Sequence, residues 1–336
     1  MYRNFPLFLF ISLLIVIARA TGQDTNTLTY EVFKDPHFQD GFILLDPGLG
    51  KLTPYGKTPA LTKEGVPSWN LAQWSSLYPL KESENTVKPD GAISYVNEGK
   101  SVVLGPVGSA SADLTLGVKG KVEYAGHGKT ARKEGEAWPH LLIQQAFDDF
   151  PAITELASLE FSIEAKLNEV QKLETSDYNP NLHSAIFLGY FTLQDTNPAS
   201  ASYNQCVWFC IPVYDDRHRV PPEYMATDAG KSDATGMFIY TLSGSVYTPD
   251  SAHDGKWITL RKDLLPLFRD ALKMAWERGY LKGNRDFSDY RITTFALGWE
   301  IPGTFDAEAQ IRNLSLKATR SEKPSVDSAA LAENRP

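Results

Sequence analysis

The sequence predicts an all-β protein, a two-sheet antiparallel β-sandwich of jelly-roll type with one helix packed on its surface. The prediction rests on apolar segments of strand length that are separated by turn residues. These segments are residues 100–104, 112–118, 138–147, 158–167, 184–193, 203–214, 235–242, 256–261, 291–300 and 307–318. Only residues 263–281 repeat their apolar side chains at helical spacing. A chain of 336 residues is long enough to bury a sizeable core.

Residues 1–20 have the pattern of a secretory signal peptide. Arg3 precedes an apolar run, residues 5–17, and small residues follow at Ala18 and Ala20. The run is shorter than the roughly 20 apolar residues that a transmembrane helix needs. We therefore expect cleavage near Ala20 and a secreted or periplasmic protein without a membrane span.

Residues 24–318 are expected to form the sandwich domain. Prolines interrupt its first part, residues 24–90, at Pro36, Pro47, Pro54, Pro59, Pro67, Pro79 and Pro89. Prolines at this spacing break helices, so this part should contain short strands and long loops, either as a loop-rich extension or as the edge of the sandwich. Residues 319–336 are small, polar or charged, which predicts a flexible tail.

The predicted helix begins near Asp263 and ends near Leu281. Asp263 can cap its first turn, Pro266 suits the first turn, and Gly279 suits the end. Its apolar residues share one face, which we expect to pack on the outer surface of a sheet: Leu265, Phe268, Leu272 and Ala275. The helix is therefore interpreted as structural.

The charge balance excludes one large class of function. The chain has 33 Lys and Arg against 41 Asp and Glu, with a formal net charge of −8. Because no basic stripe is present to neutralise phosphates, nucleic acid is not an expected partner. The aromatic content, Tyr 15, Phe 17 and Trp 7, suits a β-protein that binds sugars.

The two cysteines, Cys206 and Cys210, predict neither a disulfide nor a metal site. On a strand they point to the same side but lie ~13 Å apart, beyond the ~7 Å that a disulfide tolerates. Two cysteines with scattered histidines do not form a zinc pattern. No cofactor is expected, and a structural calcium ion has no supporting motif.

Strand alternation separates core residues from a face that a ligand could reach. In 203–214 the predicted core row is Val207, Phe209, Ile211 and Val213, and the opposite row is Asn204, Cys206, Trp208, Cys210 and Tyr214. In 138–147, His140 and Gln144 lie opposite the apolar row. In 291–300, Thr294, Ala296 and Gly298 lead to Glu300. These small residues suggest a floor that a substrate could approach closely.

Glu300 is the strongest candidate for a catalytic group. It ends a strand, follows Trp299 and precedes Pro302 and Gly303. A carboxyl group in such a partly apolar position suits a general acid. The alternative is a solvated carboxylate at the rim of the sheet.

Residues 292–303, with Gly298-Trp299-Glu300 at their centre, resemble the late-strand motif of family 12 glycoside hydrolases. The resemblance implies a concanavalin A-like jelly roll, and it gives Glu300 the acid/base role of a retaining β-glucanase. The family's nucleophile strand carries Glu-x-Met-x-Trp. The nearest match is residues 204–208, which places Asn204 where the nucleophilic carboxylate should be.

An amide cannot replace that carboxylate, because retaining hydrolysis needs two carboxyl groups ~5 Å apart. Glu160, Glu164 and Asp216 are the candidate replacements for the nucleophile. An inverting arrangement, with a wider gap that holds a water, is easier to satisfy.

Other residues fit polysaccharide lyases that act on uronate-containing glycans. Elimination needs a polar or cationic group beside the uronate carboxylate and a Tyr or His that takes the C5 proton. The candidates for such a substrate-binding set are His140, Gln144, His183, Tyr190, Asn204 and Arg217. Trp208 and Tyr190 would stack on sugar rings. A third hypothesis is a glycan-binding module without catalysis. All three imply an extracellular polysaccharide or oligosaccharide as partner.

Residues 214–219 combine Asp215 and Asp216 with Arg217 and Arg219. Adjacent aspartates on an extended chain point to opposite sides, so they do not form a ready calcium chelate. Ion pairs with the arginines are the favoured interpretation.

Overall fold

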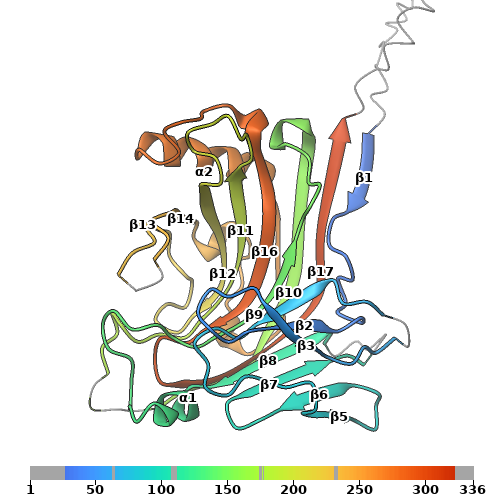
Figure 1. The fold of residues 1–336 in the computed structure, drawn as a ribbon, viewed down its shortest axis with the longest axis vertical. Helices are drawn as coiled ribbons and strands as arrows, with labels where there is room; N and C mark the ends of the chain where they lie inside the picture. The colour runs from blue at the N-terminus through green and yellow to red at the C-terminus, as the bar shows by residue number, and fades with distance from the viewer. Residues whose placement is uncertain are drawn as a thin grey trace, which may run out of the picture.

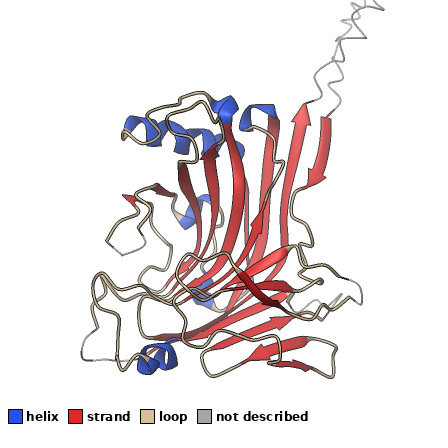
Figure 2. Ribbon diagram, in the orientation of Figure 1, coloured by secondary structure: helices blue, strands red, loops and turns tan. Residues whose placement is uncertain are grey.

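The protein is a sandwich of two β-sheets, as Figures 1 and 2 show. The computed structural model describes residues 27–62, 65–106, 112–173, 176, 178–230 and 234–321. Strand pairing is antiparallel except between β12 and β14 and between β2 and β4. The predicted all-β, two-sheet architecture is confirmed.

The first sheet has eight strands in the order β15-β10-β17-β8-β7-β6-β5, and β1 also pairs with β17. Their bounds are β1 Thr27–Glu31, β5 Asn85–Val87, β6 Ile93–Val96, β7 Lys100–Leu104, β8 Leu114–Lys119, β10 Leu156–Lys172, β15 Ile258–Asp263 and β17 Phe305–Ser321.

The second sheet has nine strands in the order β13-β14-β12-β11-β16-β9-β4-β2-β3. Their bounds are β2 Phe42–Leu45, β3 Pro54–Lys57, β4 Trp69–Ala72, β9 His140–Ala146, β11 Ile186–Asp195, β12 Cys206–Asp215, β13 Tyr224–Thr227, β14 Phe238–Thr241 and β16 Tyr290–Glu300. Every strand segment that the sequence predicts is present, with ends shifted by a few residues.

The proline-rich part, residues 24–90, contributes strands to both sheets. β1 and β5 pair within the eight-stranded sheet, whereas β2, β3 and β4 form one side of the nine-stranded sheet. The predicted signal peptide, residues 1–20, and residues 322–336 of the predicted tail lie outside the described residues. β17 continues to Ser321, so residues 319–321 are strand rather than tail.

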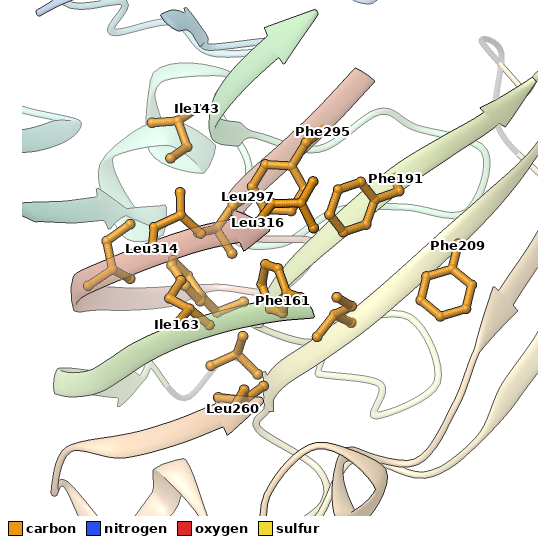
Figure 3. Close-up of a cluster of buried hydrophobic side chains, with 14 of the residues drawn as sticks. Ile143, Phe161, Ile163, Phe191, Phe209, Leu260, Phe295, Leu297, Leu314 and Leu316 are labelled. Carbon is orange, nitrogen blue, oxygen red and sulfur yellow. The ribbon is translucent and has the colours of Figure 1, made fainter. Parts of the chain in front are cut away.

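The core lies between the sheets and is rich in phenylalanine. Figure 3 shows Phe161, Phe191 and Phe295 converging from three strands. The Phe191 and Phe295 ring centroids are 4.6 Å apart, and Phe161 lies 6.0 Å from each. The predicted core row of β12, which includes Phe209 and Ile211, is buried here. Each fully buried aromatic ring contributes several kcal/mol of hydrophobic stabilisation, roughly 25 cal/mol per Å² of apolar area.

The alternation predicted for β12 is wrong at Tyr214. The register shifts there, so that Leu188 pairs with Pro212 while Phe187 pairs with Tyr214, and Val213 is the extra residue. This β-bulge reverses the alternation after it. Tyr214 therefore points into the core, where its ring lies 6.1 Å from Trp299. The bulge also turns Asp215 toward the outer face of the sheet.

The main helix, α2, spans Leu265–Glu277. Asp263 accepts a hydrogen bond from the Leu265 backbone N–H at 3.1 Å, as expected of a residue at a helix start. Phe268 packs against the core residues Phe191 and Phe209, with centroids 5.6 and 4.7 Å away. The prediction that the helix packs on the outer surface of a sheet is therefore wrong. α2 covers one end of the sandwich (Figure 1) and contributes to the core between the sheets.

A second helix, α1 (Gly120–Gly126), follows β8. Short 3₁₀ turns occur at Ile153–Glu155, Gly244–Val246, Ala252–Asp254 and Phe287–Asp289. Glu123 of α1 forms an ion pair with Lys100 of β7, and both side chains are fully buried. Ser76 donates to Glu123 Oε1 at 2.6 Å, and the Leu77 N–H donates to Oε2 at 2.8 Å. The buried carboxylate is thus satisfied by one cation and two neutral donors.

Candidate functional site

The site lies on the outer face of the nine-stranded sheet, the face directed away from the core. Strand register defines it, because paired residues in neighbouring strands point to the same side. Glu300 of β16 pairs with His140 of β9 on one side and with Ile186 of β11 on the other. In a parallel row, Ala296 pairs with Gln144 and Tyr190. Four predicted site residues thereby share one face.

The Glu300 carboxylate is held by a neutral donor. Trp138 Nε1 donates to Glu300 Oε2 at 3.1 Å. His140 Nε2 lies 3.9 Å from the same oxygen. The Glu300 side chain is 20% exposed, so the carboxylate is largely enclosed but still reachable. Glu300 is therefore not a fully solvated rim carboxylate, and among the described residues it forms no ion pair with a lysine or arginine.

Aromatic rings surround this carboxylate. The Trp138 ring stacks on His140 with centroids 5.6 Å apart and an interplanar angle of 22°. Trp74, which follows β4 and whose carbonyl accepts the His140 N–H, lies edge-on to His140 with ring centroids 5.9 Å apart. The guanidinium carbon of Arg132 lies 4.4 Å from the centre of the Trp138 ring. One indole ring therefore contacts a carboxylate, an imidazole and a guanidinium.

The negative charge of Glu300 acts on the pKa values of Tyr190 and Cys210. Burial raises the pKa of Tyr190, and the negative charge of Glu300 adds to the rise, so the phenol remains protonated. Burial raises the pKa of Cys210 to about 12, although a hydrogen bond with Thr241 opposes the rise. Cys206 and Cys210 are both buried, free thiols.

Tyr190 extends the aromatic surface to the next strand. Its ring meets Trp208 edge-on at 5.4 Å, and Trp208 Nε1 donates to Thr235 Oγ1 at 3.3 Å. On the other side of Ala296, Gln144 has a buried side-chain oxygen without a hydrogen-bond partner among the described residues. A buried amide oxygen without a partner costs free energy, and a ligand hydroxyl could satisfy it.

Gly298 has a structural role in placing Glu300. A Cβ on this residue would lie 2.1 Å from the Leu141 carbonyl oxygen and 3.0 Å from the Leu142 Cα. Its φ of +154° also disfavours a side chain. The small residue before Glu300 thus permits the close approach of β9 and β16, the strands that carry His140 and Glu300.

Asn204 does not lie with Glu300. It is in the turn before β12, with φ of +66°, and its side-chain oxygen accepts from Gln194 Nε2 at 3.2 Å. Gln194 and Ile186 lie near opposite ends of β11, roughly 26 Å apart at 3.3 Å per residue, and Ile186 is the residue that pairs with Glu300. The structure therefore separates Asn204 from the carboxylate that the family 12 resemblance would pair it with.

Glu164 lies apart from the site, and His183 contacts its neighbour Arg132 through the backbone of that residue. His183 is buried in a loop, where its ring bonds the Arg132 carbonyl at 2.7 Å and the Asn179 N–H at 2.9 Å. Glu164 belongs to β10 in the other sheet, and it accepts from Arg312 Nε at 2.7 Å and Asn313 Nδ2 at 2.9 Å. Among the other candidates, Glu160 lies on β10 with Arg261 Nε 3.8 Å away.

Asp216 and Arg217 lie just beyond β12. Asp216 accepts the Ala185 N–H at 2.7 Å, and burial raises its pKa. Arg217 donates through Nε and Nη2 to the two oxygens of Asp215, at 2.8 and 2.6 Å. Asp215, like Ile186 with which it pairs, faces the outer side of the sheet. Both arginines of this segment form ion pairs, since Arg219 pairs with Asp254 at 2.7 Å.

Sequence reasoning did not select Trp138, Trp74 or Asp215. The signal for Trp138 was present, because a residue two positions before His140 shares its side of an extended chain. Trp74 is close to His140 only through the pairing of chain segments remote in sequence. Asp215 faces this side only because of the bulge at Val213, which alternation does not reveal.

Among the residues that the structure describes, no helix is both long and apolar enough to cross a membrane. Within the same ranges, no group of three or more His, Cys, Asp or Glu side chains could hold a metal ion.

No family model and no curated protein matches the chain. Solved structures that are similar include a family 12 xyloglucanase from Bacillus licheniformis, at 9% identity, TM-score 0.40 and coverage of 74% of this chain and 99% of that one. Endoglucanase cel12A from Rhodothermus marinus is 10% identical, with a TM-score of 0.36 and coverage of 73% of this chain and 97% of that one. A family 11 xylanase from Neocallimastix patriciarum is 9% identical, with a TM-score of 0.36 and coverage of 74% of this chain and 99% of that one. At these identities and scores, function has to be inferred from the residues of the site.

Proposed function

We propose that the protein is an exported, carbohydrate-active enzyme that hydrolyses a polysaccharide, with Glu300 as the general acid. One observation carries this proposal: a largely enclosed carboxylate is bound by an indole N–H rather than by a cation, and it lies among aromatic rings. Such rings bind the apolar faces of sugars, while amide groups such as Gln144 bind hydroxyls. A protonated carboxyl group at this position can donate to a glycosidic oxygen.

Asp215 is the carboxylate that we propose as the partner of Glu300. Register places it on the same face, with only Ile186 of β11 between them. Two strand spacings give a Cα separation of about 10 Å. Burial acts to raise the pKa of Asp215, but hydrogen bonds from Arg217 lower it overall, so the group stays ionised. An ionised partner at this separation suits a base that activates water, as in inverting hydrolysis, better than a nucleophile ~5 Å away.

A polysaccharide lyase is the second candidate. The observation that favours it is that His140, Tyr190 and Gln144 share the face with Glu300. In elimination from a uronate, His140 would take the C5 proton and the neutral Tyr190 phenol would protonate the departing oxygen. Glu300 would then only orient His140.

Incubation with neutral and uronate-rich polysaccharides separates these functions. New reducing ends without absorbance from a C4–C5 double bond, abolished by Glu300→Gln, are the result expected for hydrolysis. Absorbance that survives Glu300→Gln would contradict hydrolysis in favour of elimination. Binding of a glycan with neither product would leave a glycan-binding module without catalysis. Glu164→Gln, which changes a carboxylate on the other sheet, is the matched control.

A further inference from the structure

Arg132 is a cation beside the site that forms no ion pair with a carboxylate among the described residues, although Glu136 and Glu134 lie close enough to act on its pKa. Among the described residues, its hydrogen bonds go to backbone oxygens: Nε donates to Glu136 O at 2.7 Å, and Nη1 donates to Leu182 O at 3.1 Å. It forms no ion pair within those residues. Its neighbour Lys129, by contrast, pairs with the Glu136 carboxylate at 2.7 Å. The two carbonyls orient the guanidinium, and no carboxylate among the described residues accepts a hydrogen bond from it.

Arg217, the cation selected from the sequence, differs in this respect. Both oxygens of Asp215 bind it, and these hydrogen bonds raise the pKa of Arg217. The pKa of Arg132 is instead lowered, chiefly by burial. An arginine already engaged with a carboxylate has little capacity for a second anion. A half-buried arginine without a carboxylate partner is stabilised most when it binds an anionic ligand.

Arg132 is also placed at the candidate catalytic group. Its guanidinium lies over the ring of Trp138, and that ring's N–H binds Glu300. A single indole therefore separates the cation from the Glu300 carboxylate. A sugar that contacts the Trp138 ring edge would have its substituents within reach of Arg132, whose Nη2 has no hydrogen bond to a described residue.

We propose that Arg132 binds an anionic substituent of the glycan, a uronate carboxylate or a sulfate ester, so that the substrate is an acidic polysaccharide. This inference rests on the proposed function, because it takes the face around Glu300 as the glycan site. It holds for hydrolysis and for elimination alike. The planar guanidinium presents N–H groups in a fork that matches the oxygens of either anion.

The test measures binding by the full chain carrying Glu300→Gln, so that the ligand is not consumed. The probes are oligogalacturonate, oligomannuronate and a sulfated galactan oligosaccharide, each compared with its methyl-esterified or desulfated counterpart. Titration calorimetry should show at least one acidic probe bound roughly tenfold or more tightly than its neutral counterpart. The uronate and sulfate probes distinguish the two sources of charge.

Arg132→Gln should remove that preference, so that the acidic probe and its neutral counterpart bind with similar affinity. Arg132→Lys should retain part of it, because the charge remains but the fork is lost. The matched control is Arg320→Gln. Arg320 lies on β17 of the other sheet and pairs with Glu155, so this variant removes an equal charge far from the candidate site. Thermal unfolding of each variant checks that the loop carrying Arg132 stays folded.

Equal affinities for acidic and neutral probes, or a preference that survives Arg132→Gln, would overturn the assignment of Arg132. In that case cleavage of a neutral polysaccharide that depends on Glu300 would leave the proposed function intact. Failure of every probe to bind, together with the absence of cleavage across the polysaccharide panel, would overturn both proposals.

Discussion

Glu123 and Glu300 are two enclosed carboxylates in different regions of the same molecule. Glu123 belongs to α1, where Lys100, Ser76 and the Leu77 N–H satisfy its carboxylate, and its side chain is 0% exposed. Glu300 lies on the outer face of the nine-stranded sheet, is 20% exposed, and accepts from the neutral N–H of Trp138. The first is bound in an ion pair, whereas the second is enclosed with no lysine or arginine partner in the part of the chain that the structure describes.

The difference indicates what each carboxylate contributes. A buried ion pair with complete hydrogen bonding supports the fold, because removing either partner leaves an uncompensated charge. A carboxylate enclosed without a lysine or arginine ion pair among the described residues contributes little to stability, and such placement is typical of functional sites. The predictions below test this contrast between a structural and a functional carboxylate.

Lys100→Met should have the largest effect on stability. It leaves Glu123 buried without its cation, which should reduce the free energy of unfolding by about 3–5 kcal/mol. Denaturant unfolding measures this loss. Lys51→Met, which alters an exposed pair with Asp46, should change the free energy by less than about 1 kcal/mol. The double variant Lys100→Met with Glu123→Gln removes both charges and keeps an acceptor for Ser76 and the Leu77 N–H, so it should recover part of the loss. Failure to recover any of it would contradict the ion-pair explanation.

Gly298→Ala should reduce the free energy of unfolding by about 2–3 kcal/mol, because its Cβ would overlap the Leu141 carbonyl oxygen. Gly56→Ala is the control, since a Cβ there meets its nearest atoms at 3.7 Å. Chemical denaturation of the two variants makes the comparison. Equal stability of both would show that β9 and β16 can separate, and that Glu300 is less rigidly placed than the contrast requires.

Much of the fold could be predicted from the sequence, because alternation along each strand is a local signal. It placed Phe209 and Ile211 in the core and Trp208 opposite them. Alternation failed at Tyr214, where a bulge reverses it, and the position of α2 depended on tertiary packing of Phe268 that no local pattern encodes. Composition indicated only short strands and loops in 24–90, whereas pairing distributes its strands over both sheets.

The candidate site was predictable in part for the same reason. His140, Gln144 and Glu300 were selected from strand alternation and Tyr190 from its residue type, and register then brings these residues of three strands onto one face. Asn204 does not join them, because it lies in the turn between β11 and β12, at the end of those strands that is remote from Glu300. Arg132 has no local signal, since its significance depends on contact with Trp138 across the fold.

Glu300→Gln should leave the free energy of unfolding unchanged or raise it by up to about 1 kcal/mol, because it removes an enclosed charge and keeps an acceptor for Trp138. Glu123→Gln should instead destabilise the protein. Thermal and denaturant unfolding of the pair gives the comparison. A loss above about 2 kcal/mol for Glu300→Gln would place Glu300 with the structural carboxylates.

The pair Asp215–Arg217 predicts a smaller effect that depends on pH. Arg217 holds the pKa of Asp215 below its ordinary value despite the opposing effect of burial. The contribution of this pair to the free energy of unfolding is therefore fully present above the pKa of Asp215 in the unfolded chain, near 3.9. It is lost as the pH falls through the lower pKa of Asp215 in the folded protein. Asp215→Asn should reduce stability by about 1 kcal/mol at pH 6 and by less at pH 2–3. A difference that is constant across this range would contradict the assigned shift.

The most direct test of the central claim compares the initial cleavage rates of Glu300→Gln and Glu164→Gln on the polysaccharide that the wild-type chain degrades. We expect Glu300→Gln to lower the rate by about a thousandfold with glycan binding retained, as for loss of a general acid. Glu164→Gln, on the eight-stranded sheet, should keep the wild-type rate. Equal rates for the two variants would contradict the assignment of Glu300 as the catalytic acid.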